Sequence, residues 1–96
     1  MEIKIHAVKF KVDSKLEELI EKKVEKLGVF MPSAFKAEVT LKVDADQKVS
    51  NKITEVRLNV PGYDLFATKR YDSFEEGVDD CVNALKKQIE KAKDNK

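Results

Sequence analysis

Residues 35–43 have the sequence FKAEVTLKV, in which hydrophobic and polar side chains alternate at every position. An alternation with a period of two predicts a β-strand that buries one face and exposes the other to water. The side chains predicted to point inward are Phe35, Ala37, Val39, Leu41 and Val43. Such a strand requires neighbouring strands and a second hydrophobic layer, and the segments on either side of it supply both.

Two further strands are predicted C-terminal to this one. Residues 52–60 follow a polar, turn-like segment and alternate in the same way. Their inward side chains are Val56, Leu58 and Val60. The sequence PGYD at 61–64 is typical of a turn, and LFATK at 65–69 predicts a short strand with Leu65 and Ala67 in phase. The basic and aromatic run KRY at 69–71 is predicted to be a solvated loop with a possible RNA contact.

The N-terminal residues 2–12 predict one more strand, with a shift of phase inside it. Ile3 and Ile5 share one face, whereas the later hydrophobic residues fall in the opposite phase. A shift of this kind indicates a strand that ends or bulges, here near Ala7.

Residues 14–27 predict an amphipathic helix. Asp13 or Ser14 can cap its start, Ser14 and Glu17 fit a capping box, and Gly28 suits the first residue past its end. At about 100° per residue the hydrophobic side chains form one stripe. The stripe consists of Leu16, Leu19, Ile20, Val24 and Leu27.

A second amphipathic helix is predicted to begin near Asp72, which suits the N-cap because Glu75 follows three positions later. Its stripe consists of Phe74, Val78, Cys81, Val82, Leu85 and Ile89. Gly77 inside this helix costs about 1 kcal/mol relative to alanine. The expected fold is therefore α+β with the order β-α-β-β-β-α, in which two helices cover one face of a four-stranded sheet and the other face is polar.

Size and composition narrow the functional classes. A chain of 96 residues is expected to form a single domain, residues 1–96, with a thin core. One cysteine excludes an intramolecular disulfide and favours a reducing, cytoplasmic location. No hydrophobic run approaches the ~20 residues of a membrane span, and the N-terminus does not resemble a signal peptide, so no membrane partner is expected.

The charges nearly cancel, with 19 Lys and Arg against 18 Asp and Glu, but they are sorted in space. In the first helix the glutamates gather on one flank and Lys15, Lys22 and Lys26 on the other, with Lys23 at the edge of the hydrophobic stripe. In the second helix the acids occupy the first turns and the lysines the last.

Two explanations of this sorting stay open. The helix macrodipole favours acids at a helix start and lysines at its end, by about 0.3–1 kcal/mol each, and Lys23 can lay its stem along apolar surface. The dipole does not sort charges around a helix, however. A basic face shared by two neighbouring helices is typical of RNA binding, because lysines neutralise phosphates and release counterions.

No catalytic or metal-binding constellation is recognisable. His6 is the only histidine and lacks partners at ligand spacing, and Cys81 lies on a hydrophobic stripe with no other histidine to activate it. Phe66 points to the open sheet face, where packing against side chains is favoured over stacking on a base. We therefore expect no enzymatic activity, metal, cofactor or small-molecule substrate.

Several stretches together resemble a known family. They are VDSKL at 12–16, KKVEKL at 22–27, VTLKV at 39–43, VPGYDLFA at 60–67, YDSFEEGVDD at 71–80 and LKKQIEKAK at 85–93. In order and spacing they are similar to the ribosome hibernation-promoting factors, also called ribosome-associated inhibitors or sigma-54 modulation proteins. The resemblance spans nearly the whole chain.

The resemblance implies a fold like that of double-stranded-RNA-binding domains. It also implies binding to the rRNA of the small ribosomal subunit between head and body, in the path of messenger RNA and the tRNA anticodon arms. Such binding silences idle ribosomes in stationary phase. Longer family members carry a C-terminal dimerisation domain. This chain ends at Lys96, so the resemblance implies a short form that is a monomer off the ribosome.

The basic contacts of the family fall here on both helices. Ala84 stands where the family commonly has a lysine, and Lys22 or Lys86 can compensate; the TKRYD stretch adds Arg70. The expected RNA-binding residues are Lys22, Lys23, Lys26, Arg70, Lys86, Lys87 and Lys91. Two other classes stay open: a generic double-stranded-RNA-binding module, which would bind free duplex about as well as ribosomes, and a protein-interaction adaptor that uses the polar sheet face.

Overall fold

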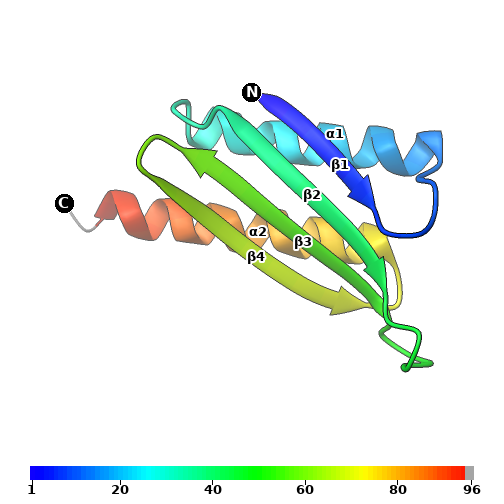
Figure 1. The fold of residues 1–96 in the computed structure, drawn as a ribbon. Helices are drawn as coiled ribbons and strands as arrows, with labels where there is room; N and C mark the ends of the chain where they lie inside the picture. The colour runs from blue at the N-terminus through cyan, green and yellow to red at the C-terminus, as the bar shows by residue number, and fades with distance from the viewer. Residues whose placement is uncertain (95–96) are drawn as a thin grey trace.

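The computed structural model describes residues 1–94 and contains six elements in the predicted order β-α-β-β-β-α. The strands are β1 (Glu2–Ala7), β2 (Lys36–Val43), β3 (Lys52–Val60) and β4 (Tyr63–Tyr71), and the helices are α1 (Ser14–Phe30) and α2 (Phe74–Asp94). Both helices lie on the same face of the sheet and leave the other face open (Figure 1). The predicted α+β fold is thus confirmed.

The four strands follow one another across the sheet in the order β1-β2-β3-β4. β1 pairs with β2 in parallel, whereas the β2–β3 and β3–β4 pairs are antiparallel. A parallel pair requires a crossover, and α1 provides it. Both helices begin at the same end of the sheet and run side by side in the same direction (Figure 1). Their C-terminal halves are therefore neighbours.

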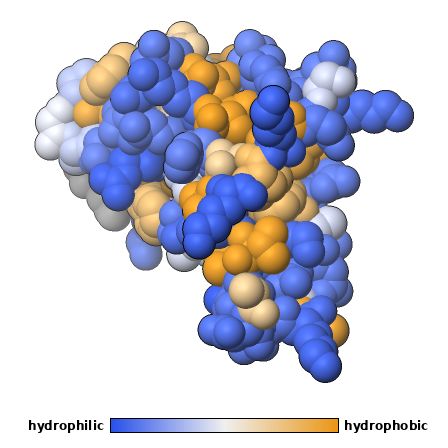
Figure 2. Space-filling view, turned by 45° about the vertical axis from the view of Figure 1, so that its right-hand side comes forward, coloured by the Kyte–Doolittle hydropathy of each residue, from blue (hydrophilic) through white to orange (hydrophobic). Residues whose placement is uncertain are grey.

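The core lies between the helices and the sheet. Every residue of the predicted stripe of α2 is buried, as are Ile20, Val24 and Leu27 of α1 and Val56, Leu58 and Val60 of β3. Outside the core, hydrophilic residues cover most of the visible surface, with hydrophobic residues in a broken band between them (Figure 2). The packing follows from the helical and strand periodicities in the sequence.

Gly77 of α2 lies directly against Thr54 of β3. A Cβ atom at position 77 would overlap with the Thr54 hydroxyl oxygen and lie 3.0 Å from the Thr54 Cβ. The helix tolerates a glycine here because only a residue without a side chain lets α2 approach the sheet so closely. Thr54 is itself fully buried, and its hydroxyl oxygen has no hydrogen-bond partner among residues 1–94.

The predicted end of the first helix was wrong. α1 continues through Gly28 to Phe30, and the Met31 amide donates a 2.8 Å hydrogen bond to the Leu27 carbonyl. Pro32 explains where the helix stops, because the residue before a proline is disfavoured in helical geometry, and Met31 accordingly has non-helical angles, φ −133° and ψ 80°. At the other end Asp13, one of the two predicted caps, is the N-cap. Its side chain accepts a 2.8 Å hydrogen bond from the Leu16 amide.

The segment before α2 also differs from the prediction. The turn is confined to Pro61 and Gly62, with Gly62 at φ +90°, and β4 extends through Tyr71. Residues 69–71, predicted as a loop, pair with residues 52–54 of β3. Ser73 rather than Asp72 caps α2, because its hydroxyl accepts from the Glu76 amide and donates to the Glu76 carboxylate. Asp72 instead accepts a 2.5 Å bond from the Ser50 amide.

Two smaller expectations concern the strand ends. β1 stops at Ala7, where the sequence predicted an end or a bulge. Phe35 and Val43 were predicted to point into the core but are exposed, because they lie at the two extremes of the β2 segment, outside the buried cluster.

None of the described helices is long and apolar enough to cross a membrane.

Candidate nucleic-acid interface

The parallel course of the two helices gathers lysines at one end of the helical layer. The C-terminal half of α1 carries Lys22, Lys23 and Lys26, and that of α2 carries Lys86, Lys87, Lys91 and Lys93. We call these seven residues the lysine end. The opposite end of the layer is acidic, with Glu17 in the first turn of α1 and Glu75 and Glu76 in that of α2. Six of the seven predicted RNA-binding residues belong to the lysine end.

Lys22 and Lys26 are both exposed, and both line a hollow beside the C-terminal half of α1. The hollow has a volume of about 510 Å³, and its wall mixes polar groups with apolar ones from Met1, Val29 and Pro32. Glu25 is the acidic residue in this wall. Both lysines therefore present their ammonium heads beside a partly hydrophobic surface.

Lys23 joins the two helices. Its Nζ atom lies 2.9 Å from an Asp79 carboxylate oxygen on α2, and its side chain is only 30% exposed. An exposed ion pair of this type contributes about 0–1 kcal/mol, so a phosphate can replace the carboxylate at little cost. Lys23 is thus held between α1 and α2 rather than projected into solvent.

Lys86 and Lys93 both contact Phe30, the last residue of α1. The Lys86 ammonium lies 5.0 Å from the centroid of the Phe30 ring, and Lys93 Nζ donates a 2.7 Å hydrogen bond to the Phe30 carbonyl oxygen. α1 has no basic residue in its own last turn, so α2 supplies the cations that its C-terminus favours. Sequence reasoning missed this role of Lys93, although the missing base in the last turn of α1 was a signal.

Lys87 and Lys91 are exposed and lie on a different side of α2. At about 100° per residue, Lys87 points directly away from the core, and Lys91 is turned toward β4. Asp80 marks the β4 side of the helix, because its carboxylate accepts a 2.5 Å bond from the Tyr71 hydroxyl. The basic surface therefore extends from α1 across the outward-facing ridge of α2 to the side of α2 that faces β4.

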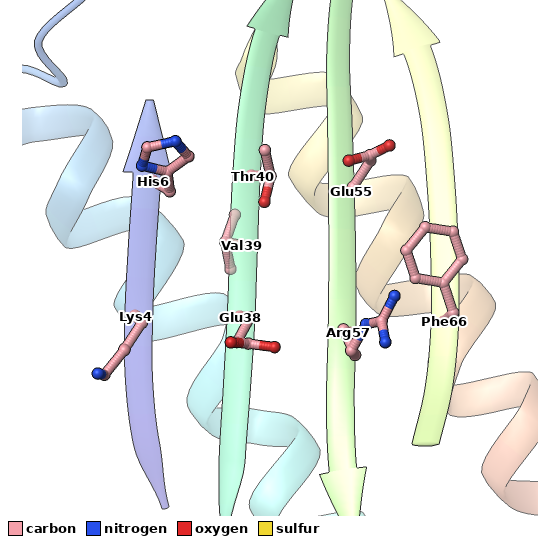
Figure 3. Close-up of a pocket in the computed structure, with 8 residues that line it drawn as sticks. All are labelled: Lys4, His6, Glu38, Val39, Thr40, Glu55, Arg57 and Phe66. Carbon is pink, nitrogen blue, oxygen red and sulfur yellow. The ribbon is translucent and has the colours of Figure 1, made fainter. Parts of the chain in front are cut away.

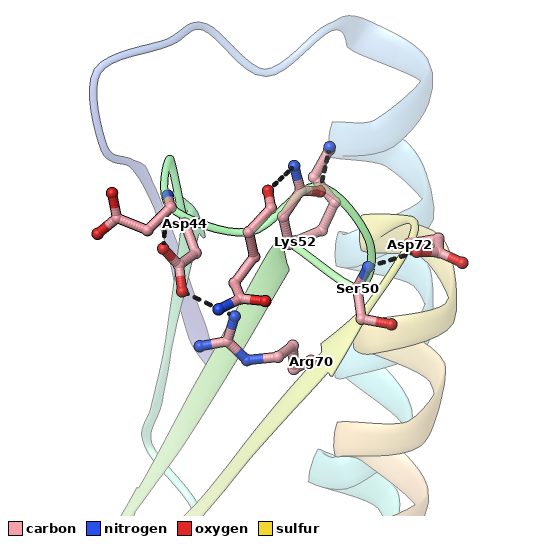
Figure 4. Close-up of polar contacts among 8 residues, drawn as sticks. Asp44, Ser50, Lys52, Arg70 and Asp72 are labelled. Carbon is pink, nitrogen blue, oxygen red and sulfur yellow. Dashed lines mark hydrogen bonds and ion pairs between the residues drawn. The ribbon is translucent and has the colours of Figure 1, made fainter.

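Arg70, the seventh predicted residue, lies apart from the others. It projects from β4 on the open sheet face, and its guanidinium forms a 2.9 Å ion pair with Asp44 at the end of β2 (Figure 4). Hydrogen bonds from Arg70 and from the Asp46 amide lower the pKa of Asp44. The structure does not bring Arg70 together with the lysine end.

The open sheet face has its own shallow hollow of about 420 Å³ (Figure 3). Arg57 lies over the Phe66 ring, 5.5 Å from its centroid, so Phe66 packs against a side chain as expected. Most charges on this face are matched by neighbours, as in the Lys42–Glu55 pair at 3.2 Å and the Arg57–Asp64 pair at 3.5 Å. Because acids and bases alternate, the face lacks the excess of positive charge that RNA binding requires.

No described feature offers a nucleophile or a metal site. Cys81 is fully buried, its thiol lies 3.4 Å from the Thr54 carbonyl, and burial raises its pKa to about 12. The thiolate is therefore not populated near neutral pH. Within residues 1–94 no three His, Cys, Asp or Glu side chains come together as a metal-binding group.

The fold is shared with two solved structures. A ribosomal subunit interface protein from Coxiella burnetii superposes with a TM-score of 0.86 at 22% identity, covering 99% of this chain and 100% of that one. The N-terminal domain of Thermus thermophilus Protein Y superposes with a TM-score of 0.79 at 20% identity, covering 95% and 98%. No curated protein sequence matches the chain significantly.

The sequence itself matches one family model over nearly its whole length, from residue 3 to residue 96. That model describes sigma 54 modulation protein / S30EA ribosomal protein. The resemblance noted from the sequence is therefore confirmed, and the chain belongs to the sigma 54 modulation protein / S30EA ribosomal protein family.

Proposed function

We propose that this protein is a ribosome-associated translation inhibitor that binds the rRNA of the small subunit in the channel for messenger RNA and tRNA. The observation that carries the proposal is the lysine end, formed because α1 and α2 run in parallel and place their basic halves side by side. The chain also belongs to a family whose description includes a ribosomal protein, and this membership supports the ribosome as the target. One of the two similar structures is a ribosomal subunit interface protein, which is consistent with this target.

The chemistry of the lysine end suits rRNA. The ammonium groups of Lys22, Lys26, Lys87 and Lys91 can each neutralise a phosphate and release a counterion. Lys23 joins them by exchanging its Asp79 partner for a phosphate. The acidic end of the helices repels RNA, so only one end of the helical layer binds and the orientation of the protein on the subunit is defined.

Inhibition is by occupancy and not by chemistry. The described residues offer no activated nucleophile and no metal-binding group. A bound domain excludes messenger RNA and tRNA from the same volume, and its effect reverses when it dissociates. We propose that this reversible block operates in the cytoplasm when ribosomes are idle, as in stationary phase or stress.

A competition experiment on purified small subunits tests the mechanism. Messenger RNA and initiator tRNA, bound first, should raise the apparent Kd of the protein in proportion to their occupancy. The protein, added first, should slow formation of the initiation complex and leave the rRNA intact on a sequencing gel. Simultaneous saturation of the subunit by the protein, messenger RNA and tRNA would contradict the steric mechanism.

A second arm separates this function from a generic double-stranded-RNA module. The same protein is titrated with a free RNA duplex of about 16 base pairs, the length that such modules span. We expect the duplex to bind far more weakly than the subunit, because the lysines are spread over several sides of the two helices and do not follow one regular groove. Equal affinity for both would favour the generic module.

A further inference from the structure

β4 is an edge strand, and its outer edge is not paired with another strand of residues 1–94 (Figure 1). The Phe66 carbonyl points outward from this edge, because it accepts a 2.9 Å hydrogen bond from the Gln88 side chain of α2. In an antiparallel sheet the amide and carbonyl of one residue point the same way and alternate along the strand. The backbone groups of Asp64, Thr68 and Arg70 therefore also face outward, as a template for another strand.

The sequence of β4 is complementary to itself. In an antiparallel pairing with a two-fold axis at Ala67, Asp64 of each copy lies opposite Arg70 of the other, and Phe66 lies opposite Thr68. All four of these residues have outward-facing backbone groups, so the residues that lie opposite each other can form the backbone hydrogen bonds between the two strands. An axis at Leu65 or Lys69 would also bring outward-facing residues opposite each other. It would lose the pairing of opposite charges, however, and such pairing stabilises cross-strand neighbours.

The side of α2 that lies over β4 is complementary in the same sense. Asp80 lies on this side in the first half of the helix and Lys91 in the second half. Glu76 and Lys87 lie next to them on the outward-facing ridge. Ala84, with its small side chain, lies between the two halves. A two-fold axis near Ala67 makes the two copies of α2 antiparallel, so that the basic half of each meets the acidic half of the other.

A cavity is available to receive the lysines. A hollow of about 250 Å³ lies beside the N-terminal half of α2, and its lining consists of Tyr71, Glu76, Asp79, Asp80 and Asn83. Within the described part of the chain, the only cation paired with Asp80 is Lys69 at 3.8 Å, a distance at the limit of an ion pair. The hollow therefore favours one more ammonium group.

We propose that this chain forms a two-fold symmetric dimer with a second copy of itself, through antiparallel pairing of β4 with β4 and contact of α2 with α2. The Thr68 amide of the partner copy replaces Gln88 as donor to the Phe66 carbonyl. Asp64 gives up its contacts with Arg57 and Asn59, and Arg70 gives up its contact with Asp44. Asp64 of each copy then pairs with Arg70 of the other copy across the axis. These exposed contacts contribute little, so their exchange does not oppose pairing.

The proposed dimer differs from the monomer expected from the sequence. The reason is that the unpaired edge of β4 becomes visible only once the strand order in the sheet is known. An interface of one strand and part of one helix is small, so association is weak and depends on protein concentration. The dimer itself does not rest on the proposed function. If Lys87 and Lys91 bind rRNA as proposed above, however, the dimer covers them, and dimer and ribosome-bound copy are alternative states.

Sedimentation equilibrium of the purified chain from about 10 μM to about 1 mM tests the dimer. The wild-type chain is compared with Asp64→Arg and Arg70→Asp, and each variant is first shown to be folded by its thermal unfolding curve. Each variant places two like-charged pairs across the axis, so its dimer Kd should rise at least about tenfold.

An equimolar mixture of the two variants is the decisive sample. In the mixed pair the arginine introduced at position 64 of one copy faces the aspartate introduced at position 70 of the other, and native Arg70 faces native Asp64. The mixture should therefore recover dimers that neither variant forms alone, with a Kd close to that of the wild type. A wild-type chain that stays monomeric at about 1 mM, or a mixture that stays monomeric, would overturn the proposal.

Discussion

Lys93 of α2 donates a 2.7 Å hydrogen bond to the carbonyl oxygen of Phe30, the last residue of α1. Through this bond a side chain of α2 caps the C-terminus of α1, although the two residues are 63 positions apart in the sequence. Lys86 completes the arrangement from the same flank of α2 by contacting the Phe30 ring. The lysine end of the molecule therefore has a structural part, Lys86 and Lys93, and a part that remains available to a ligand.

Replacing Lys93 by alanine should lower the free energy of unfolding by about 0.5–1 kcal/mol, since the hydrogen bond and the charge near the end of the α1 dipole are both lost. Urea unfolding followed by circular dichroism measures the change. Lys91→Ala is the matched control, because it removes the same side chain two residues earlier on a different side of the helix. Equal losses in the two variants would show that the bond to Phe30 adds nothing.

Gly77→Ala should destabilise the protein by about 1–3 kcal/mol, although alanine is the better helix former by about 1 kcal/mol. The reason is the overlap of the new Cβ with the Thr54 hydroxyl. Thermal unfolding of a double-mutant cycle with Thr54→Ala measures the coupling. Removal of the hydroxyl should recover part of the loss, and strictly additive effects would exclude the contact as the cause.

Changing Lys87 and Lys91 together to glutamate should abolish co-sedimentation with small ribosomal subunits while the fold persists, because exposed substitutions alter stability by under about 0.5 kcal/mol. The control is Lys4→Glu with Lys48→Glu, an equal change of charge on exposed residues outside the helices. The control should bind like the wild type. Unchanged binding of the folded Lys87 and Lys91 variant would remove these residues from the interface.

Affinity for the subunit should fall linearly with salt on a double-logarithmic plot, because each contacting lysine releases counterions from a phosphate. Removing Lys26 alone should reduce the slope by about one unit. Filter binding at several potassium concentrations gives both slopes. A response that is flat across this range would point to a protein partner and to the adaptor function instead.

Cys81 should be inert to iodoacetamide in the folded protein at about pH 8.5 and reactive in urea, because burial raises its pKa from 9.0 to about 12. The unfolded chain therefore loses its thiol proton at a lower pH than the folded chain. The contribution of Cys81 to stability is complete below pH 9 and is lost as the pH rises toward 12. Mass spectrometry of the alkylated protein measures the reactivity, and rapid labelling of the native state would contradict the burial.

Much of the fold was predictable because it depends on periodicity. Alternation along β2 and β3, and the stripes of α1 and α2, specify which side chains are buried, and every stripe residue of α2 is buried as predicted. The element boundaries were less predictable. Gly28 resembles a helix end, but the hydrogen-bond ladder continues until Pro32 interrupts it, and KRY at 69–71 joins β4 because β3 offers it a partner.

The partners that divide the predicted site come from segments far apart in the sequence. Residues 86, 87 and 91 are all lysines on one helix, yet Lys86 contacts Phe30 whereas Lys87 and Lys91 face solvent. Lys23 appeared to be a lysine at the edge of the core, and its partner Asp79 comes from a segment 56 residues away. Arg70 was grouped with the lysines by charge, but strand alternation places it on the opposite face of the sheet.

The sequence by itself determined the element order, the buried faces and the family, because periodicity, capping and motif spacing are properties of neighbouring residues. Only the tertiary structure decided which charges are paired and which face solvent. The parallel course of α1 and α2 brings two lysine-rich halves together, pairs Lys23 with Asp79 and leaves the outer edge of β4 open. The physical reason is that electrostatic interactions and backbone pairing depend on distance in space, and the fold alone sets the distances between segments far apart in the chain.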